Sequence, residues 1–385
     1  MKILIGADLV PTSTNMELFA QAKSETLLGG PLKELLHSAD YRIFNLETPL
    51  ADRETPIAKC GPCLRAETQT VSGLKSFGVD FFTLANNHIL DQGAEGLLST
   101  VQTLETAGIA YAGVGNTPEE AARAHLVTVE GKTLGVYCCA EHEFTIVSDD
   151  APGANPYDPL ESFDHVRSLR PQCDYLIVLY HGGKEYCRYP SPGVRKMCRK
   201  FVDCGADLVL CQHTHCIGCE EDYAGKKIVY GQGNFLFDHS EREEWQTSLL
   251  VQCHITDDGA AVSYHPLRKT GNTTSLAEPE DARQILEAFC VRSQELQCEE
   301  IWKSRYAEFA QKSRQQLLLR VNGQLHRSLG FRVLSRLFGK KFMDRYLAKC
   351  YDKNALLVLR NTVESESWRE LLLESIHTMH RSPKG

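Results

Sequence analysis

Five short apolar runs in this chain each lead, within a few residues, to side chains that can bind a metal ion. The runs cover residues 2–7, 41–46, 81–85, 175–180 and 206–210, and the side chains that follow are Asp8, Glu47, Asn87 with His88, His181, and His213 with His215. In an open α/β sheet, the carboxyl ends of the strands line one crevice, and ligands bind there. The repeated pattern therefore predicts an α/β fold with one polar site where several strands end.

The histidine pair is the most informative of these positions. His213 and His215 are one residue apart just beyond a strand, so both can point at one centre while the backbone turns. Neutral imidazole is a common metal ligand, and carboxylates complete such sites. A single histidine or aspartate at a strand end more often caps a turn or lies at the surface. Five coincident placements nevertheless favour a hydrolytic centre with two metal ions.

Helical and strand-like patterns alternate along residues 1–270. Apolar residues at 97, 98, 101 and 104 have helical spacing, and Gly108 predicts the end of that helix. Residues 109–114 then have a strand pattern, and hairpins are expected around 130–132 and 257–259. These elements together predict a mixed sheet with helices on both faces. Two long loops, 51–65 and 148–159, have the length of functional lids.

The last third of the chain differs in pattern and in charge. Residues 271–275 have the composition of a linker, and helical patterns follow over 282–319, 331–351 and 366–379. Residues 283–385 contain 19 Lys and Arg and 11 Asp and Glu, a formal net charge of +8, whereas the residues before Arg283 have a formal net charge of −16. We therefore expect two domains, 1–270 and 280–385. The acidic body argues against nucleic acid as the ligand.

Three features of the sequence indicate a cytoplasmic protein. No apolar run approaches the roughly 18 residues that a transmembrane helix needs. Residues 1–8 have the pattern of a first core strand and become acidic too soon for a signal peptide. The fifteen cysteines are odd in number, and several lie within apolar runs. They indicate free and mostly buried thiols in a reducing cytosol.

With these residues in view, the chain resembles the bacterial poly-gamma-glutamate capsule synthesis family (CapA-type proteins) of the calcineurin-like metallophosphatase superfamily. The motifs that carry the resemblance are GAD at 6–8, NLETPL at 45–50, LANNH at 84–88 with Asp91 and Gly93, YHGGKEY at 180–186, GAD at 205–207 through HTH at 213–215, and YGQGNF at 230–235. They occur in family order over about residues 1–240, and the tail after about 280 lies outside the resemblance. The implied fold is a four-layer α/β/β/α sandwich of the metallophosphatase type, here with a C-terminal helical extension.

The resemblance also implies metal ligands, position by position. Asp8 and His215 would bind the first metal ion, and Glu47 would bridge both ions. The other ligands of the second ion would be Asn87, His181 and His213. Val10 stands where the wider superfamily usually has a metal-binding histidine, and Glu47 stands where it has an aspartate. One or two divalent ions are therefore expected, and these ligand types suit Mn, Fe or Zn.

If the chain is an enzyme, His88 would donate a proton to the leaving group, and Asp91 would orient His88. Asp91 could instead cap the helix that begins near Gly93. The candidate substrate contacts are Arg65, Lys184, Glu185 and Asn234. The first three could instead be solvated loop charges, and Asn234 could instead hold a turn near the site.

Two cysteine patterns allow other interpretations. Cys60 and Cys63 have the spacing of thioredoxin-like redox motifs, but that chemistry needs a strand before the pair and a helix directly behind it. A structural zinc is a second possibility, since three cysteines flank the histidine pair. They are Cys211, Cys216 and Cys219, and no second pair completes four ligands.

Three functional hypotheses follow from these patterns. The first is a cytoplasmic metal-dependent hydrolase that acts on a phosphoester. The second is a capsule or exopolymer biosynthesis component that binds or processes a polyglutamate-like polymer. The third is a non-catalytic scaffold whose basic C-terminal helices dock a protein partner. Those helices could also lie on a membrane surface or cap the sandwich.

Overall fold

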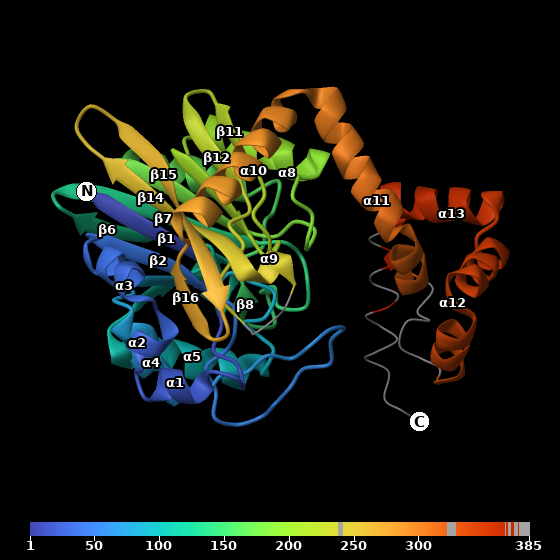
Figure 1. The fold of residues 1–385 in the computed structure, drawn as a ribbon, viewed down its shortest axis with the longest axis horizontal. Coiled ribbons are helices and arrows are strands. Elements are labelled where there is room, and N and C mark those ends of the chain that lie inside the picture. Colours follow the sequence, from blue (N-terminus) through green and yellow to red (C-terminus); the bar gives the residue numbers. More distant parts are fainter. Residues whose placement is uncertain (238–241, 322–328, 366, 369–370, 373–375, 377–385) are drawn as a thin grey trace. The chain divides into compact units, whose positions relative to one another are not determined.

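The computed structural model describes residues 1–237, 242–321, 329–365, 367–368, 371–372 and 376 of the chain (Figure 1). Its contacts divide the chain into a large unit, Met1–Tyr306, and a smaller C-terminal unit, Ala307–Gly385. The large unit contains all the strands of the described residues and all the candidate site residues. The division into domains 1–270 and 280–385 stays a prediction.

Two sheets form the centre of the large unit. Among the described residues, the first sheet has the order β16-β15-β14-β1-β2-β3-β4, with β13 also paired to β1. Its strands are β1 (Lys2–Leu9), β2 (Tyr41–Leu46), β3 (Phe81–Thr83), β4 (Ala110–Ala112), β13 (Asn234–Leu236), β14 (Thr247–Ile255), β15 (Ala260–Thr270) and β16 (Thr273–Leu276). The second sheet has the order β11-β12-β10-β9-β7-β6. Its strands are β6 (His125–Val129), β7 (Lys132–Ala140), β9 (Tyr175–His181), β10 (Leu208–Gln212), β11 (Glu220–Tyr223) and β12 (Lys226–Tyr230).

Short helices cover the outer faces of both sheets. The helices of the large unit are α1 (Met16–Ala20), α2 (Ser24–Leu27), α3 (Gly30–His37), α4 (Val71–Ser76), α5 (Gly93–Ala107), α6 (Pro118–Ala121), α7 (Ser162–Leu169), α8 (Pro192–Asp203), α9 (Glu243–Gln246) and α10 (Pro279–Gln297). Two short 3-10 helices, η1 (Thr68–Thr70) and η2 (Arg170–Gln172), and a small ladder of β5 (Val114–Gly115) with β8 (Gly153–Ala154) complete it. In Figure 1, helices α1 to α5 gather on one side of β1 and β2.

Alternation along the strands produces the layers. Ile3 and Ile5 of β1 pack in the apolar layer between the two sheets, whereas Leu4 packs under the helices that cover the first sheet. In β9, Ile177 faces the layer between the sheets, and Val178 packs with α7 and α8. Successive side chains of a strand point to opposite faces, so strands covered on both faces are apolar throughout. The α/β/β/α sandwich expected from the sequence is confirmed.

Several local predictions agree with the structure, and one is wrong. The predicted helix is α5, and the two predicted hairpins are β6–β7 and β14–β15. Residues 271–275 are not a linker: they form a turn and most of β16, which pairs antiparallel with β15. An edge strand needs no apolar alternation, because polar residues protect its open side. The composition of this segment therefore concealed a strand.

The C-terminal unit is helical, as expected. Its helices are α11 (Glu299–Val321), which begins in the large unit, α12 (Leu329–Cys350) and α13 (Lys353–Glu364). Leu319, Met343 and Leu347 form a small buried cluster within this unit. Most of the helix predicted over 366–379 lies outside the described residues. Among the residues that are described, no helix is both long and apolar enough to cross a membrane.

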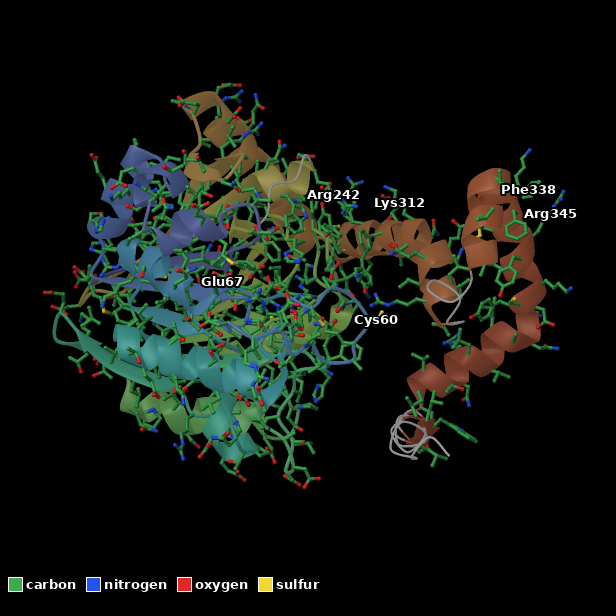
Figure 2. All side chains as sticks on the ribbon, turned by 90° about the horizontal axis from the view of Figure 1, so that it is seen from below. Cys60, Glu67, Arg242, Lys312, Phe338 and Arg345 are labelled. Atoms are coloured by element: carbon green, nitrogen blue, oxygen red, sulfur yellow. The ribbon has the colours of Figure 1, made fainter. Side chains whose placement is uncertain are left out.

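The cysteine predictions can also be compared with the fold. All fifteen cysteines are free, and nine are buried, in agreement with the expected thiols. A cytoplasmic location stays a prediction. Cys60 is exposed on its loop (Figure 2), and no helix starts directly behind Cys63, because the next helical turn is η1. The loop therefore lacks the strand and helix that a thioredoxin-like site needs.

Candidate metal centre

The carboxyl ends of parallel strands from both sheets meet at one polar site. Asp8 lies at the end of β1 and Glu47 directly follows β2, and both belong to the first sheet. His181 ends β9, and His213 and His215 follow β10 in the second sheet. Each of these side chains is at least nine-tenths buried. The sandwich thus brings together side chains that are up to two hundred residues apart in the sequence.

Two groups of ligand atoms share the Glu47 carboxylate. Among the described residues, Glu47, His181 and His213 place one ligand atom each within 4.8 Å of one another, and Asp8, Glu47 and His215 do the same. His181 Nε2 lies 3.2 Å from Glu47 Oε1 and 3.1 Å from His213 Nδ1. It also lies 3.0 Å from Asn87 Oδ1. The structure therefore brings together all six residues that the sequence predicted as ligands.

Unsatisfied buried oxygens indicate that this site fits a cation. Among the described residues, Asp8 Oδ2 and both carboxylate oxygens of Glu47 accept no hydrogen bond, although both residues are fully buried. The nearest imidazole nitrogens, His215 Nδ1 at 3.5 Å from Asp8 Oδ2 and His181 Nε2 at 3.2 Å from Glu47 Oε1, make ion-pair contacts only. A buried carboxylate that lacks partners is costly, and such groups are normally hydrogen-bonded, ion-paired or bound to a metal. Carboxylate oxygens and imidazole nitrogens are the donors that Mn, Fe and Zn accept. The residues present thus fit one or two divalent ions.

The electrostatics of the site point to the same conclusion. Burial, with the neighbouring His181 and His215, holds the pKa of His213 well below its ordinary value, which favours the neutral form that binds metals. For His215, burial lowers the pKa, but the close contact with the Asp8 carboxylate and the charge of Glu47 outweigh it and raise the pKa to about 9. The pKa of His181 is likewise raised, because Glu47 outweighs burial. Positive charge is thus favoured next to both carboxylates, and a bound cation would supply it.

The backbone turn that contains His213 and His215 sets the direction of both imidazoles. His213 and His215 both have positive φ, +83° and +52°, a conformation that non-glycine residues adopt rarely. Thr214 between them turns its hydroxyl to the carbonyl oxygen of Cys216, at 3.2 Å. A Cβ at Gly231 would lie 2.7 Å from that hydroxyl, so the turn needs glycine there. The turn therefore directs both imidazoles into the site.

His88 and Asp91 are in contact, and the lysine Lys59 is paired with the same aspartate. The Asp91 Oδ2 atom lies 2.5 Å from His88 Nδ1 and accepts the backbone N–H of Leu64 at 2.6 Å. Asp91 does not cap α5: Gln92 occupies the N-cap position without a side-chain bond. The buried ammonium of Lys59 donates to Asp91 Oδ1 at 2.6 Å and to the carbonyl oxygen of Asn87 at 3.1 Å. Sequence reasoning missed Lys59, whose only local signal was its place in the long loop 51–65.

Two further carboxylates contact the proposed ligands. Glu143 Oε2 accepts the amide N–H of Asn87 at 3.1 Å, which leaves Asn87 Oδ1 directed towards His181. Glu141 Oε1 lies 3.4 Å from His213 Nε2. Such contacts orient metal ligands. Sequence reasoning missed both, although they follow the apolar residues of β7 in the same way as the predicted ligands follow their strands.

The candidate substrate contacts lie in less definite positions. Arg65 is half-buried and donates to the carbonyl oxygen of Ala51 at 2.9 Å. Lys184 is exposed and Glu185 is half-buried, on the loop after β9. Asn234 lies at the metal centre itself, with its Oδ1 atom 2.8 Å from His215 Nδ1. Substrate contact by these four residues stays a prediction.

Aromatic side chains surround His215 on its outer side. The rings of Trp245 and Phe237 have centroids 5.2 and 5.5 Å from that of His215, and Tyr186 lies at 6.1 Å. The guanidinium of Arg242 lies over the Tyr186 ring, 5.0 Å from its centroid. These contacts restrict the imidazole and keep water from that side of it. The metal-ligand groups of the described residues contain no cysteine, so Cys211, Cys216 and Cys219 take no part in them.

Known proteins of bacterial capsule synthesis are similar to this chain. A family model described as bacterial capsule synthesis protein PGA_cap matches residues 5–239. The capsule biosynthesis protein CapA of Bacillus anthracis is 31% identical over 237 residues, which are 59% of this chain and 57% of that protein. The PGA biosynthesis protein CapA of Bacillus subtilis (strain 168) is 27% identical over 241 residues, 59% of this chain and 61% of that protein. The chain thus matches less than two thirds of the length of these relatives.

Solved structures with a similar fold include phosphatases. A novel phosphatase of Mycoplasma pneumoniae has a TM-score of 0.44 at 12% identity and covers 70% of this chain and 94% of its own. A 5′-nucleotidase precursor of Thermus thermophilus has a TM-score of 0.40 at 14% identity and covers 75% of this chain and 58% of its own.

Proposed function

Because the chain belongs to the bacterial capsule synthesis protein PGA_cap family, with a buried centre of carboxylates and histidines, we propose that it is a divalent-cation-dependent hydrolase of a phosphoester. The observation that carries the proposal is the Glu47 carboxylate. It is fully buried, neither oxygen accepts a hydrogen bond from the described residues, and it belongs to both groups of ligand atoms. A carboxylate in that position is suited to bridge two cations.

The residues around the centre have separate tasks in this proposal. Bound cations would lower the pKa of a coordinated water and polarise the phosphoryl oxygen. Glu143 holds the amide of Asn87, and Glu141 faces His213, so both ligands keep their orientation. Asp91 holds His88 by its Nδ1 atom, which leaves Nε2 as the nitrogen that can donate a proton to the leaving oxygen.

A His213→Ala variant tests the proposal directly. We expect it to lose the second cation and to hydrolyse activated aryl phosphate mono- and diesters at least about 100-fold more slowly, because metal stabilisation of the transition state is worth several kcal/mol. Metal per chain by mass spectrometry and initial rates on both ester classes are the measurements. His254→Ala is the matched control, since His254 is exposed on β14. Unchanged metal content and rates in His213→Ala would rule out this centre.

His88→Ala tests the acid role separately. The variant should keep both cations, yet it should slow turnover of esters with poor leaving groups by about 10²–10⁴-fold, because only those need a proton from the enzyme. Esters with activated leaving groups should be affected much less. The measurement is kcat across a series of leaving groups. Equal slowing along the whole series would contradict an acid role.

A second candidate function is the binding or processing of an acidic polymer in capsule synthesis. The names of the relatives support it. The positive net charge of residues 307–385, which contain 15 Lys and Arg and 7 Asp and Glu, supports it as well. The same assay separates the two candidates if poly-γ-glutamate is added as a substrate. Shortening of the polymer that is lost in His213→Ala would favour polymer processing over phosphoester hydrolysis. Retention of an unshortened polymer would indicate a binding role.

A further inference from the structure

Asn234 occupies a defined place beside the first cation site. It is the first residue of β13, which runs parallel to β1, and its register partner on β1 is Asp8. Gly233 before it has φ of +79°, and a Cβ there would lie 2.8 Å from the carbonyl oxygen of Thr247. The entry into β13 is therefore tightly constrained. The backbone places the Asn234 side chain at the same strand ends that hold the ligands of the centre.

The side chain of Asn234 is directed at a ligand atom. Its Oδ1 atom lies 2.8 Å from His215 Nδ1, and only 3% of the residue is exposed. Its Nδ2 atom is buried and has no hydrogen-bond partner among the described residues. A buried asparagine with a purely structural role normally has partners for both ends of its amide. Here only the oxygen is engaged, and it lies among the ligand atoms.

The spacing of these atoms suits a common cation. Two ligand atoms that are each about 2.1 Å from one ion lie about 3.0 Å apart at a right angle and about 3.4 Å apart at a tetrahedral angle. The Asn234 Oδ1–His215 Nδ1 distance is 2.8 Å, and the Asp8 Oδ2–His215 Nδ1 distance is 3.5 Å. Within the part of the chain that the structure describes, Asp8 Oδ2 and the Glu47 oxygens accept no hydrogen bond. Together these residues offer four ligand atoms to one ion.

Val10, which stands where the wider superfamily usually has a metal-binding histidine, lies next to β13. Val10 is buried and apolar, and its N–H donates to the carbonyl oxygen of Leu236 on β13 at 2.8 Å. This backbone pairing brings β13 against the end of β1, where a ligand at position 10 would otherwise lie. Asn234 thus reaches the centre from the neighbouring strand.

We infer that Asn234 Oδ1 is the fourth protein ligand of the first cation, with Asp8, Glu47 and His215. The inference rests on the cation centre proposed above, and it replaces the substrate contact expected for Asn234 from the sequence. An amide oxygen is neutral, so the only carboxylates at this ion are Asp8 and Glu47, and the second ion shares Glu47. Oxygen and imidazole ligands of this kind suit hard or borderline cations such as Mn²⁺.

Metal titration of the full chain tests the inference. Chelator-stripped protein is titrated with Mn²⁺, and bound metal per chain is measured for wild type, Asn234→Ala and Asn234→Asp. We expect two equivalents in wild type, loss or at least tenfold weakening of one in Asn234→Ala, and two again in Asn234→Asp, which restores an oxygen ligand. The matched control is Asn155→Ala, because Asn155 is an equally buried asparagine whose amide donates to the carbonyl oxygen of Cys138.

Cobalt spectra distinguish a ligand from a residue that only orients His215. With Co²⁺ in place of Mn²⁺, loss of a ligand changes the coordination number and therefore the visible absorption of the first site. An unchanged spectrum and two bound ions in Asn234→Ala would overturn the inference. If that variant does not fold, Asn234→Leu, which keeps a similar volume but offers no oxygen, takes its place, and two bound ions with an unchanged spectrum would overturn the inference equally.

The result also separates this inference from the proposed function. A wild-type protein that binds one ion, which Asn234→Ala keeps, would overturn the ligand role and leave a mononuclear centre for hydrolysis. A wild-type protein that binds no ion would overturn both.

Discussion

Replacing Glu47 by glutamine is expected to remove both cations and to slow phosphoester hydrolysis by about 10³-fold or more. The substitution keeps the size of the side chain but removes the negative charge that both groups of ligand atoms share. Each cation would lose an anionic ligand in a site from which water is excluded, and several kcal/mol of transition-state stabilisation would be lost with the ions. Of the residues in these two groups, Glu47 alone belongs to both.

The measurements for Glu47→Gln are metal per chain and kcat/KM on the same ester. The control is Glu67→Gln, because Glu67 lies outside the centre, where its carboxylate accepts only the amide of Gln69 (Figure 2). That variant should bind two ions and turn over normally. Two tightly bound ions in Glu47→Gln would show that Glu47 does not bridge them, and the candidate centre would then need a different arrangement.

Replacing Lys59 by methionine is expected to lower the free energy of unfolding by about 3 kcal/mol, since breaking a buried ion pair leaves an uncompensated charge. The side chains of Lys59 and Asp91 are 2% and 0% exposed, so water cannot take the place of the lost ammonium. For a unit of about 300 residues, this corresponds to a fall in Tm of about 5 °C. We also expect slower turnover, because Asp91 holds His88.

Thermal unfolding and urea titration of the metal-free protein measure this effect without interference from cation binding. Lys75→Met is the matched control, since the exposed Lys75 ammonium donates only to the carbonyl oxygen of Ala107. Its stability should change by no more than about 0.5 kcal/mol. Equal Tm values for Lys59→Met and wild type would mean that Lys59 does not hold the loop 51–65 to the centre.

Much of the sandwich could be predicted because strands and helices leave periodic patterns in the sequence. Ile3, Leu4 and Ile5 alternate between two apolar layers, and a strand covered on both faces therefore has a continuous apolar run. The hairpins were predictable from turn residues between such runs. β16 was not, because its polar residues carry no such pattern, and its partner β15 alone makes it a strand.

The ligand residues were found because each follows a strand that could itself be recognised. Glu141 and Glu143 follow the apolar strand β7 in the same way, so the same rule would have found them. Lys59 was missed for a different reason, because it contacts Asp91 across 32 positions from a loop with no periodic pattern. The local sequence of a loop does not determine which distant residues its side chains contact.

The sequence by itself determined the alternation of elements, the strand ends and the residue types placed there, because those depend on local propensity and on burial along one strand. Only the tertiary structure decided that Glu47 lies between two histidine groups, that β13 brings Asn234 to His215, and that a buried lysine contacts Asp91. These contacts depend on the packing of two sheets and on loops that cross them. The distances involved are set by the whole sandwich rather than by any segment of it.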